Sequence, residues 1–314
     1  MKLGMIRSTY PNEKRVALLP EHITNFGENL VVERGFGEMM DIPDEAYAEK
    51  GCRLADREEI FAECNAIFSL KLIQPHDYPH IRDGQMIVGW THPEESGKKF
   101  MEAQGFPKEL IIVDLDNIKP SIHLNGKKAL IDSIPRNFVV KNSFVAGFAS
   151  AVHAITSYGQ LPHTDTKIAI LAAGNVSQGA FTAVSKLGGQ DIRLFYRKTM
   201  NEFKETLSDY DIIISGIEMD DKSKHILSED EQQQLKPGAL VIDAAADAGY
   251  AFEGVDYTTY EKPLYKKHGV YYYCVNNAPS YLYRESSRAI SESFSKWVYS
   301  RDMQEFYDAA QTLT

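Results

Sequence analysis

The sequence predicts an α/β protein of two Rossmann-like domains, each built on a parallel sheet, with a cleft between them and a long bridging helix. Short apolar runs alternate with amphipathic helical patterns, which is typical of parallel sheets covered by helices. This alternation occurs in two successive series along the chain. Between the two series, residues 141–159 place small and apolar side chains at helical spacing, so we expect one long helix there.

The first series begins near the amino terminus. Its β-rich apolar runs predict strands at residues 2–6, 29–33, 66–72, 85–90 and 109–115. The segments between these runs have helical periodicity and predict helices at residues 20–26, 44–50, 57–63 and 96–103.

The second series follows the bridging helix. It predicts strands at residues 167–173, 191–196, 210–216, 239–245 and 271–276, with helices between the earlier ones. Residues 285–311 again have a helical pattern, and we expect these carboxyl-terminal helices to pack back on the first domain. The predicted domains are therefore a substrate domain of residues 1–138 plus 285–314 and a dinucleotide-binding domain of residues 139–284.

Composition excludes several classes of function. A net charge of −10 without a basic tract argues against a nucleic-acid-binding protein, because phosphate backbones require clustered Lys and Arg. The three cysteines, Cys52, Cys64 and Cys274, lie far apart, which predicts no disulfide framework and no thiolate metal site. His76 and His80 lie among prolines that disfavour a helix aligning the two rings, so we expect a surface loop and no metal. No apolar run is long enough for a signal peptide or membrane span, and we expect a soluble cytoplasmic protein.

A turn in the second series has the character of a nucleotide site. The segment from Lys167 to Val184 reads KIAILAAGNVSQGAFTAV, a strand followed by a glycine turn and a helix. Such a turn lets the backbone approach a pyrophosphate, and the helix amino terminus supplies N–H groups and a positive dipole. Ala172, Gly174 and Ser177 occupy the fingerprint positions, so only the second glycine is present. Alanine is tolerable at the first position only if its backbone φ stays negative.

The next strand indicates which cofactor binds there. It ends in Tyr196, Arg197 and Lys198, where an NAD-binding domain carries an acidic residue for the ribose hydroxyls. An acid there would repel a 2′-phosphate, whereas Arg197 and Lys198 can pair with one. The sequence therefore favours NADP over NAD.

Three basic residues follow strands of the first series. Arg15 follows the first strand, Lys71 ends another, and His92 follows a third. Carboxyl ends of parallel strands share one edge of an open α/β sheet, so these side chains can converge. Fixed cations can bind the carboxylate of a keto acid while an imidazole exchanges a proton at the reacting centre. Asp114 and Asp116 end a further strand, where either can raise the pKa of a nearby base.

A series of motifs in the same order resembles the alanine dehydrogenase, transhydrogenase and saccharopine dehydrogenase superfamily over nearly the whole chain. The motifs are NEKRVALLP, SLKLIQP, GWTHP, LAAGNVSQGAF, DAAADAG and VNNAPS. Longer segments, such as FSLKLIQPHDYPHIRDGQMIVGWTHP, KNSFVAGFAS, FYRKTM and LVIDAAADAG, are similar to the carboxyethylornithine synthases within it.

The resemblance implies NADPH-dependent reductive condensation of pyruvate with the side-chain amine of ornithine or lysine to give an N-(1-carboxyethyl) amino acid. It implies that Arg15 and Lys71 bind the keto acid, that His92 is the catalytic histidine, and that Asp116 tunes this base. It places Asp247, as a catalytic residue, and Asn277 near the nicotinamide, and it implies a homodimer or homotetramer. The cofactor-binding residues expected from the turn and the resemblance together are Ala172, Gly174, Asn175, Val176, Ser177, Tyr196, Arg197, Lys198 and Asn277.

Other functions stay open at this point. An alanine dehydrogenase would use the same carboxylate clamp and histidine with free ammonia. A saccharopine-type enzyme would accept lysine and 2-oxoglutarate and needs a further cation for the distal carboxylate. A sensor would bind NADPH without turnover, but it would leave Arg15, Lys71 and His92 without a common purpose.

Overall fold

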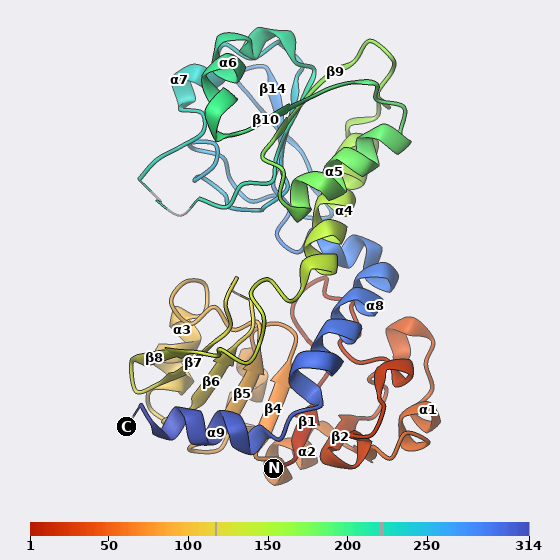
Figure 1. The fold of residues 1–314 in the computed structure, drawn as a ribbon, viewed down its shortest axis with the longest axis vertical. Helices are drawn as coiled ribbons and strands as arrows, with labels where there is room; N and C mark the ends of the chain where they lie inside the picture. Colours follow the sequence, from red (N-terminus) through yellow and green to blue (C-terminus); the bar gives the residue numbers. More distant parts are fainter. Residues whose placement is uncertain (117, 220, 222, 314) are drawn as a thin grey trace. The chain divides into compact units, whose positions relative to one another are not determined.

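The first sheet has eight strands in the order β3-β2-β1-β4-β5-β6-β7-β8 (Figure 1). The computed structural model describes residues 1–116, 118–219, 221 and 223–313. The first six strands along the chain are parallel, and their bounds are β1 Leu3–Met5, β2 Leu30–Glu33, β3 Arg53–Ala55, β4 Ala66–Ser69, β5 Met86–Gly89 and β6 Ile111–Asp114. Two antiparallel strands, β7 Ser121–Leu124 and β8 Lys127–Leu130, complete the sheet.

Three strands of this sheet were not predicted because their sequences lack a long apolar run. β3 and β7 are short and interrupted by polar residues, and β8 reads KKAL. β8 is one of the two edge strands of the sheet, and lysines on an exposed edge discourage pairing with another chain.

Helices connect the parallel strands. They are α1 Asp44–Ala48, α2 Arg57–Glu63 and α3 Lys98–Phe100, which continues as a π-helix over Met101–Gly105. α2 has the predicted bounds because Asp56 and Glu59 form a capping box at its start. The predicted helix at residues 20–26 is wrong: only Pro20–His22 forms a 3₁₀ turn, because Ile23 takes an extended conformation. The segment Pro75–His80 is also a 3₁₀ helix, although its prolines had led us to expect a loop.

The carboxyl-terminal helices pack against the first sheet. They are α8 Tyr283–Phe294, a π-helix Ser295–Tyr299, and α9 Met303–Gln311 (Figure 1). Phe294, Phe306 and other apolar side chains of these helices enter the main core of the first sheet. The chain accordingly divides into one unit of Met1–Val139 with Ser287–Thr314 and another of Val140–Ser286.

The second unit contains a six-stranded sheet in the order β10-β9-β11-β12-β14-β13. Five strands are parallel: β9 Lys167–Leu171, β10 Asp191–Phe195, β11 Ile212–Ser215, β12 Leu240–Asp243 and β14 Val270–Tyr273. The antiparallel edge strand β13, Tyr265–Lys267, was not predicted. The helices are α4 Val140–Tyr158, α5 Asn175–Lys186, α6 Met200–Glu205 and α7 Glu229–Gln232. Two parallel-dominated sheets confirm the predicted fold class.

The long helix α4 lies against α5 at two glycines. A Cβ atom on Gly147 would come within 1.8 Å of the Val176 carbonyl oxygen. A Cβ atom on Gly179 would come within 1.9 Å of the Phe144 carbonyl oxygen. The two backbones can approach this closely only because both positions lack a side chain, and the contact fixes the first turn of α5.

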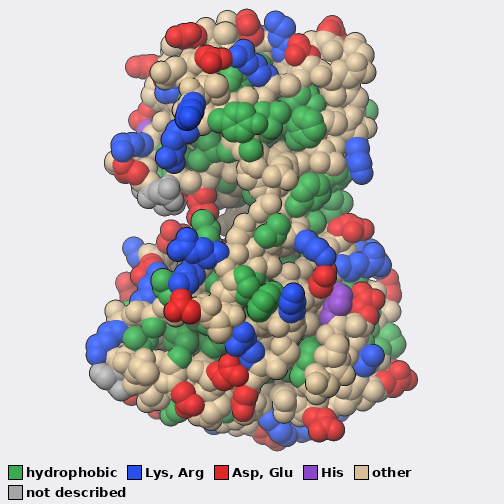
Figure 2. Space-filling view, in the orientation of Figure 1, with side chains coloured by type: hydrophobic (Ala, Val, Ile, Leu, Met, Phe, Trp, Pro, Cys, Tyr) green, Lys and Arg blue, Asp and Glu red, His purple; other side chains and the backbone are tan. Residues whose placement is uncertain are grey.

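The displayed surface of each unit carries charges of both signs. Figure 2 shows acidic and basic side chains interspersed on this face. Among the described residues, no helix combines the length and apolar character needed to cross a membrane.

Candidate functional site

The carboxyl-terminal edge of the first sheet brings together the loops that carry the predicted substrate residues. β1, β4, β5 and β6 are neighbours in the sheet and run in the same direction. Arg15 lies in the loop after β1, Lys71 two residues after β4, His92 three residues after β5, and Asp116 two residues after β6. The loop that carries Arg15 is fixed at its far end, where the N–H of Val16 donates to Ser287 Oγ of α8 at 2.8 Å.

Arg15 is buried and paired with Glu13, a residue that the sequence interpretation did not single out. Arg15 Nε donates to Glu13 Oε1 at 2.8 Å, and Arg15 Nη2 donates to Glu13 Oε2 at 2.6 Å. Each of the two side chains is only 1% exposed. The bidentate edge of the guanidinium is therefore occupied by a carboxylate of the protein itself.

Trp90 joins the two predicted cations. The guanidinium carbon of Arg15 lies 4.8 Å from the centroid of the Trp90 ring, and Lys71 Nζ lies 5.5 Å from it. Lys71 Nζ also lies 5.8 Å from the ring of Tyr10. Aromatic faces attract cations, so the indole helps to hold Arg15 and Lys71 in one cluster. Trp90 Nε1 is buried and has no hydrogen-bond partner among the described residues.

The charges of the cluster shift two pKa values. Burial lowers the pKa of Lys71, and the nearby charge of Arg15 lowers it further, while Asp116 and Glu13 oppose the change. Burial raises the pKa of Glu13, but the charge and hydrogen bonds of Arg15, with the charge of Lys71, outweigh it and hold the pKa below its ordinary value. Glu13 therefore stays ionised and compensates one of the two cations.

His92 faces Asp116 at the same edge. His92 Nδ1 lies 3.1 Å from Asp116 Oδ2, and the imidazole is 24% exposed. A carboxylate at one ring nitrogen orients the imidazole and leaves the other nitrogen for a proton transfer. Asp114 is buried and contacts the backbone of the His92 turn instead of the ring.

Ala172 departs from its expected backbone conformation. Its φ is +72°, so the expectation of a negative φ at the first fingerprint position is wrong. The N–H of Ala172 donates to the Phe195 carbonyl at 2.7 Å, which continues the β9–β10 pairing into the turn. This hydrogen bond stabilises the left-handed conformation, which costs an L-residue on the order of 1 kcal/mol.

The amino terminus of α5 has the form of an anion site. Gly174 is the residue before the helix, no side chain caps the helix start, and a Cβ atom on Gly174 would meet open space. The N–H groups of Asn175, Val176 and Ser177 donate to no group among the described residues. Ser177 is buried and its Oγ donates to the Leu171 carbonyl at 2.8 Å, so this position ties α5 to β9. The uncapped start of this helix, open at Gly174, fits a pyrophosphate.

The predicted 2′-phosphate residues lie after the edge strand β10. Tyr196, Arg197 and Lys198 are exposed. Thr199 Oγ1 accepts from the Tyr196 N–H at 2.9 Å, which fixes the turn. Neither Arg197 nor Lys198 forms an ion pair with an acidic side chain in the part of the chain that the structure describes. Both charges are therefore available to a phosphate.

Asp247 and Asn277 lie after β12 and β14 and are both buried. Asp247 Oδ2 accepts the Met219 N–H at 3.0 Å, which fixes the carboxylate. Asn277 has a left-handed backbone with φ of 84°, and its carbonyl accepts the Tyr260 hydroxyl at 2.6 Å.

A buried carboxyl next to Asp247 was also missed by the sequence interpretation. Asp243 ends β12 and accepts the N–H groups of Ala246 and Asp247 at 3.1 and 3.2 Å. Cys274 Sγ lies 3.6 Å from Asp243 Oδ2. Burial, together with the negative charge of Asp247, raises the pKa of Asp243 to about 7. The motif DAAADAG contained the signal, because an Asp four residues before another at a strand end can reach the same turn.

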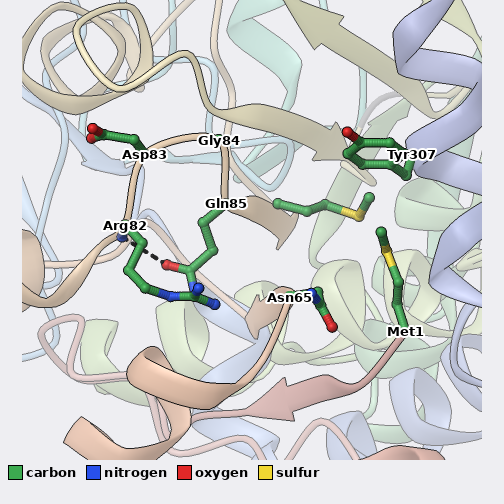
Figure 3. Close-up of a pocket in the computed structure, with 8 residues that line it drawn as sticks. Met1, Asn65, Arg82, Asp83, Gly84, Gln85 and Tyr307 are labelled. Atoms are coloured by element: carbon green, nitrogen blue, oxygen red, sulfur yellow. Dashed lines mark hydrogen bonds between the residues drawn. The ribbon is translucent and has the colours of Figure 1, made fainter.

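A cavity of about 170 Å³ lies at the opposite edge of the first sheet (Figure 3). Its walls include Met1, two residues before β1, and Asn65 and Gln85, directly before β4 and β5. Arg82 also lines it, but its guanidinium donates to the carbonyls of Phe61 and Cys64. Ligands of open α/β sheets bind at the carboxyl ends of the strands, so we assign this cavity no part in the site.

Two family models match the chain. The amino-terminal domain of alanine dehydrogenase/PNT matches residues 4–120, and the carboxyl-terminal domain of alanine dehydrogenase/PNT matches residues 144–312.

Individual proteins are similar over nearly the full length. N(5)-(carboxyethyl)ornithine synthase of Clostridium botulinum is 59% identical over 307 residues, which cover 98% of this chain and 96% of the relative. N(5)-(carboxyethyl)ornithine synthase of Lactococcus lactis subsp. lactis is 48% identical and covers 100% and 99%. Among solved structures, an L-alanine dehydrogenase superimposes with a TM-score of 0.78 at 16% identity, covering 100% of this chain and 93% of that one. This last match shows a shared fold.

Proposed function

The chain belongs to the alanine dehydrogenase/PNT family, and from this premise we propose that it joins pyruvate to the side-chain amine of ornithine or lysine by NADPH-dependent reductive condensation. The product is an N-(1-carboxyethyl) amino acid. The two relatives with the same printed activity, at 59% and 48% identity over nearly the whole chain, support this proposal. The keto-acid part of the proposal is carried by the cluster of Arg15 and Lys71 with His92 at the same edge of the first sheet, and the choice of a side-chain amine over ammonia is supported by these two relatives.

A nicotinamide cofactor follows from membership of this dehydrogenase family, and we propose that it is NADPH. The unpaired N–H groups at the start of α5 would hold the pyrophosphate, and Arg197 with Lys198 would pair with the 2′-phosphate. Asp247 and Asn277 would lie beside the nicotinamide. When bound, NADPH supplies the hydride that completes the reaction.

Charge compensation in the first unit supports a monocarboxylic keto acid as substrate. Glu13 neutralises Arg15 and occupies its bidentate edge, so Lys71 would be the main cation for the pyruvate carboxylate. Arg15 would fix the position of Lys71 through their shared contact with Trp90 and would add to the positive field. A fixed carboxylate orients the keto carbon for attack, which is the proximity contribution to catalysis.

His92 would exchange the protons of the condensation. The side-chain ammonium must lose a proton before it can attack, and His92 would accept that proton. As nitrogen bonds to the keto carbon, one of its remaining protons passes to the carbonyl oxygen to give the carbinolamine hydroxyl. His92 would then return its own proton to this hydroxyl, which leaves as water and gives the iminium. Asp116 Oδ2, 3.1 Å from His92 Nδ1, would hold the ring in the orientation for this transfer. A homodimeric or homotetrameric assembly belongs to the proposal as well.

The deciding experiment follows NADPH oxidation by absorbance with pyruvate and, in parallel, ornithine, lysine, ammonia or no amine. We expect oxidation that requires ornithine or lysine and that is slower with NADH. Activity with ammonia alone would replace the proposal by an alanine dehydrogenase activity. NADPH binding without turnover on any amine would contradict the proposed reaction.

A variant tests the role of the histidine. His92→Ala should lower kcat by about 10²- to 10⁴-fold, the usual contribution of general acid–base catalysis, with NADPH affinity unchanged. His76→Ala is the matched control, because His76 is an exposed histidine of the same unit. Full activity of His92→Ala would remove this imidazole from the mechanism.

A further inference from the structure

Asp114 holds the turn that carries His92. It is the last residue of β6 and is completely buried. Its Oδ1 accepts the Thr91 N–H at 3.1 Å, the Thr91 hydroxyl at 3.1 Å and the His92 N–H at 3.3 Å. We propose that Asp114 is a positioning residue that sets the orientation of the His92 imidazole through the backbone of this turn.

The backbone of His92 needs such a support. Its φ is 43°, in the left-handed region that a residue with a side chain adopts only where its surroundings enforce it. The His92 carbonyl accepts the N–H groups of Glu95 at 3.0 Å and Gly97 at 2.9 Å, so the chain folds back directly after the histidine. A Cβ atom on Gly97 would come within 2.1 Å of the Thr91 carbonyl oxygen. After His92, these backbone contacts hold the turn tightly folded. Before it, the N–H groups of Thr91 and His92 depend on the carboxylate of Asp114.

The strand ends below the turn are rigid. The Leu115 N–H donates to the Gly89 carbonyl at 2.9 Å, which joins the ends of β5 and β6. A Cβ atom on Gly89 would come within 1.9 Å of the Ser69 carbonyl oxygen, so the backbones of β4 and β5 also lie close together at their ends. On its other side, Asp114 pairs in register with Ser121 of β7. The backbone of Asp114 is therefore fixed between β5 and β7, and its carboxylate can hold the turn in one position.

The two neighbouring aspartates act on different parts of the histidine. Asp116 contacts the ring at Nδ1, whereas Asp114 contacts the backbone N–H. Removal of Asp114 therefore leaves the ring partner in place but releases the φ angle that aims the ring. This inference rests on the proposed role of His92, and the experiments below separate the two.

Steady-state kinetics of Asp114→Ala and Asp114→Asn give the first test. Asp114→Ala should lower kcat about 100-fold, because a displacement near 1 Å of a catalytic group has an effect of this size. KM for pyruvate and the Kd for NADPH should stay unchanged. Asp114→Asn should recover most of the activity, because its amide oxygen can still accept the same N–H groups. Equal losses in both variants, or a change in KM alone, would overturn the inference.

Asp77→Ala is the matched control, because Asp77 is a buried aspartate of the same unit that binds Arg57. It should lower thermal stability without the loss of kcat. A loss of kcat in the control as large as in Asp114→Ala would mean that any buried-charge deletion has this effect, and it would overturn the inference.

A double variant tests whether Asp114 acts through His92. In the background of His92→Ala, adding Asp114→Ala should cause no further loss of kcat, because the group being positioned is already absent. A further loss of about 100-fold, as large as in the wild-type background, would contradict the inference.

Nitrogen-15 NMR of the imidazole provides a readout that does not require turnover. The His92 signals, assigned from His92→Gln, should shift in Asp114→Ala and return close to wild type in Asp114→Asn. Unchanged signals in Asp114→Ala would overturn the inference. If the wild-type protein turns over no amine, the proposed function fails while these spectra still decide the role of Asp114.

Discussion

At the scale of single residues, the first unit holds its substrate cations by compensation of charge. Glu13 lies two residues before Arg15, and both side chains are almost completely buried. A buried guanidinium without a partner would be strongly destabilising, so the carboxylate is needed for the fold before it has any effect on catalysis. As a consequence, Arg15 adds less positive charge to the site than the sequence interpretation assigned to it, because Glu13 compensates it.

Arg197 provides the sharpest test of cofactor choice. Arg197→Asp should weaken NADPH binding by about 10- to 100-fold more than NADH binding, because it replaces a charged hydrogen bond to the 2′-phosphate with repulsion. Fluorescence titration of both cofactors measures the ratio. Lys186→Asp, at the opposite end of α5, makes the same charge change away from the turn and serves as control. An equal loss for the two cofactors in Arg197→Asp would contradict the assignment.

Asp243 makes stability depend on pH. Its pKa is raised to about 7 in the folded protein by burial and by the charge of Asp247, against an ordinary value of 3.8. As the pH rises from 4 to 7, the unfolded chain releases a proton that the folded chain retains, so the folded state loses stability over this range.

The corresponding variant is Asp243→Asn. It should remove this dependence, so that urea unfolding shows the variant gaining about 1–3 kcal/mol on wild type between pH 5 and pH 8. Parallel curves for the two proteins would show that Asp243 does not titrate in this range.

At the scale of secondary-structure elements, the contact between α4 and α5 positions the nucleotide turn. Val176, in the first turn of α5, lies directly against Gly147 of α4. The helix amino terminus that would hold a pyrophosphate is thus placed by a helix from the preceding part of the chain.

Gly147→Ala tests this contact. Alanine in place of glycine normally stabilises a helix by about 1 kcal/mol. Here the new Cβ atom would meet the Val176 carbonyl oxygen at 1.8 Å, so we expect a net destabilisation of about 1–3 kcal/mol and weaker NADPH binding. Thr156→Ala, on an exposed face of the same helix, should change stability by less than about 0.5 kcal/mol. A Gly147→Ala protein more stable than wild type would show that the two helices separate freely.

At the scale of the whole molecule, the chain folds around separate cores. The main core of the first unit includes residues from both ends of the sequence, among them Leu3 and Phe306. The core on one face of the second sheet includes Phe203 and Phe252. Among the described residues none belongs to both clusters, so the stability of each unit has its own source.

Calorimetry can separate the two cores. NADPH at about 100 times its Kd should stabilise the second unit by about 2.7 kcal/mol and raise one unfolding transition. Phe306→Ala should lower the other transition, because loss of a buried phenylalanine costs about 3–5 kcal/mol. Phe203→Ala is the matched substitution and should lower the transition that NADPH raises. A single transition that moves with all three changes would show that the units unfold together.

The sequence by itself determined the elements whose signals are local. The apolar strand runs, the capping box that starts α2 at Arg57 and the small-residue helix α4 all depend on neighbours within a few positions. The order of these elements, with the motif series, was enough for the fold class and for candidate residues such as Arg15 and His92.

Tertiary structure decided what depends on distant partners. Ala172 has a positive φ, and its N–H pairs with Phe195, a contact that the fingerprint does not encode. Trp90 meets Arg15 and Lys71 only because β1, β4 and β5 are neighbours, and the Asp114 contact exists because β5 and β6 end together. Burial and strand order arise from the whole sheet, so no local pattern can specify them.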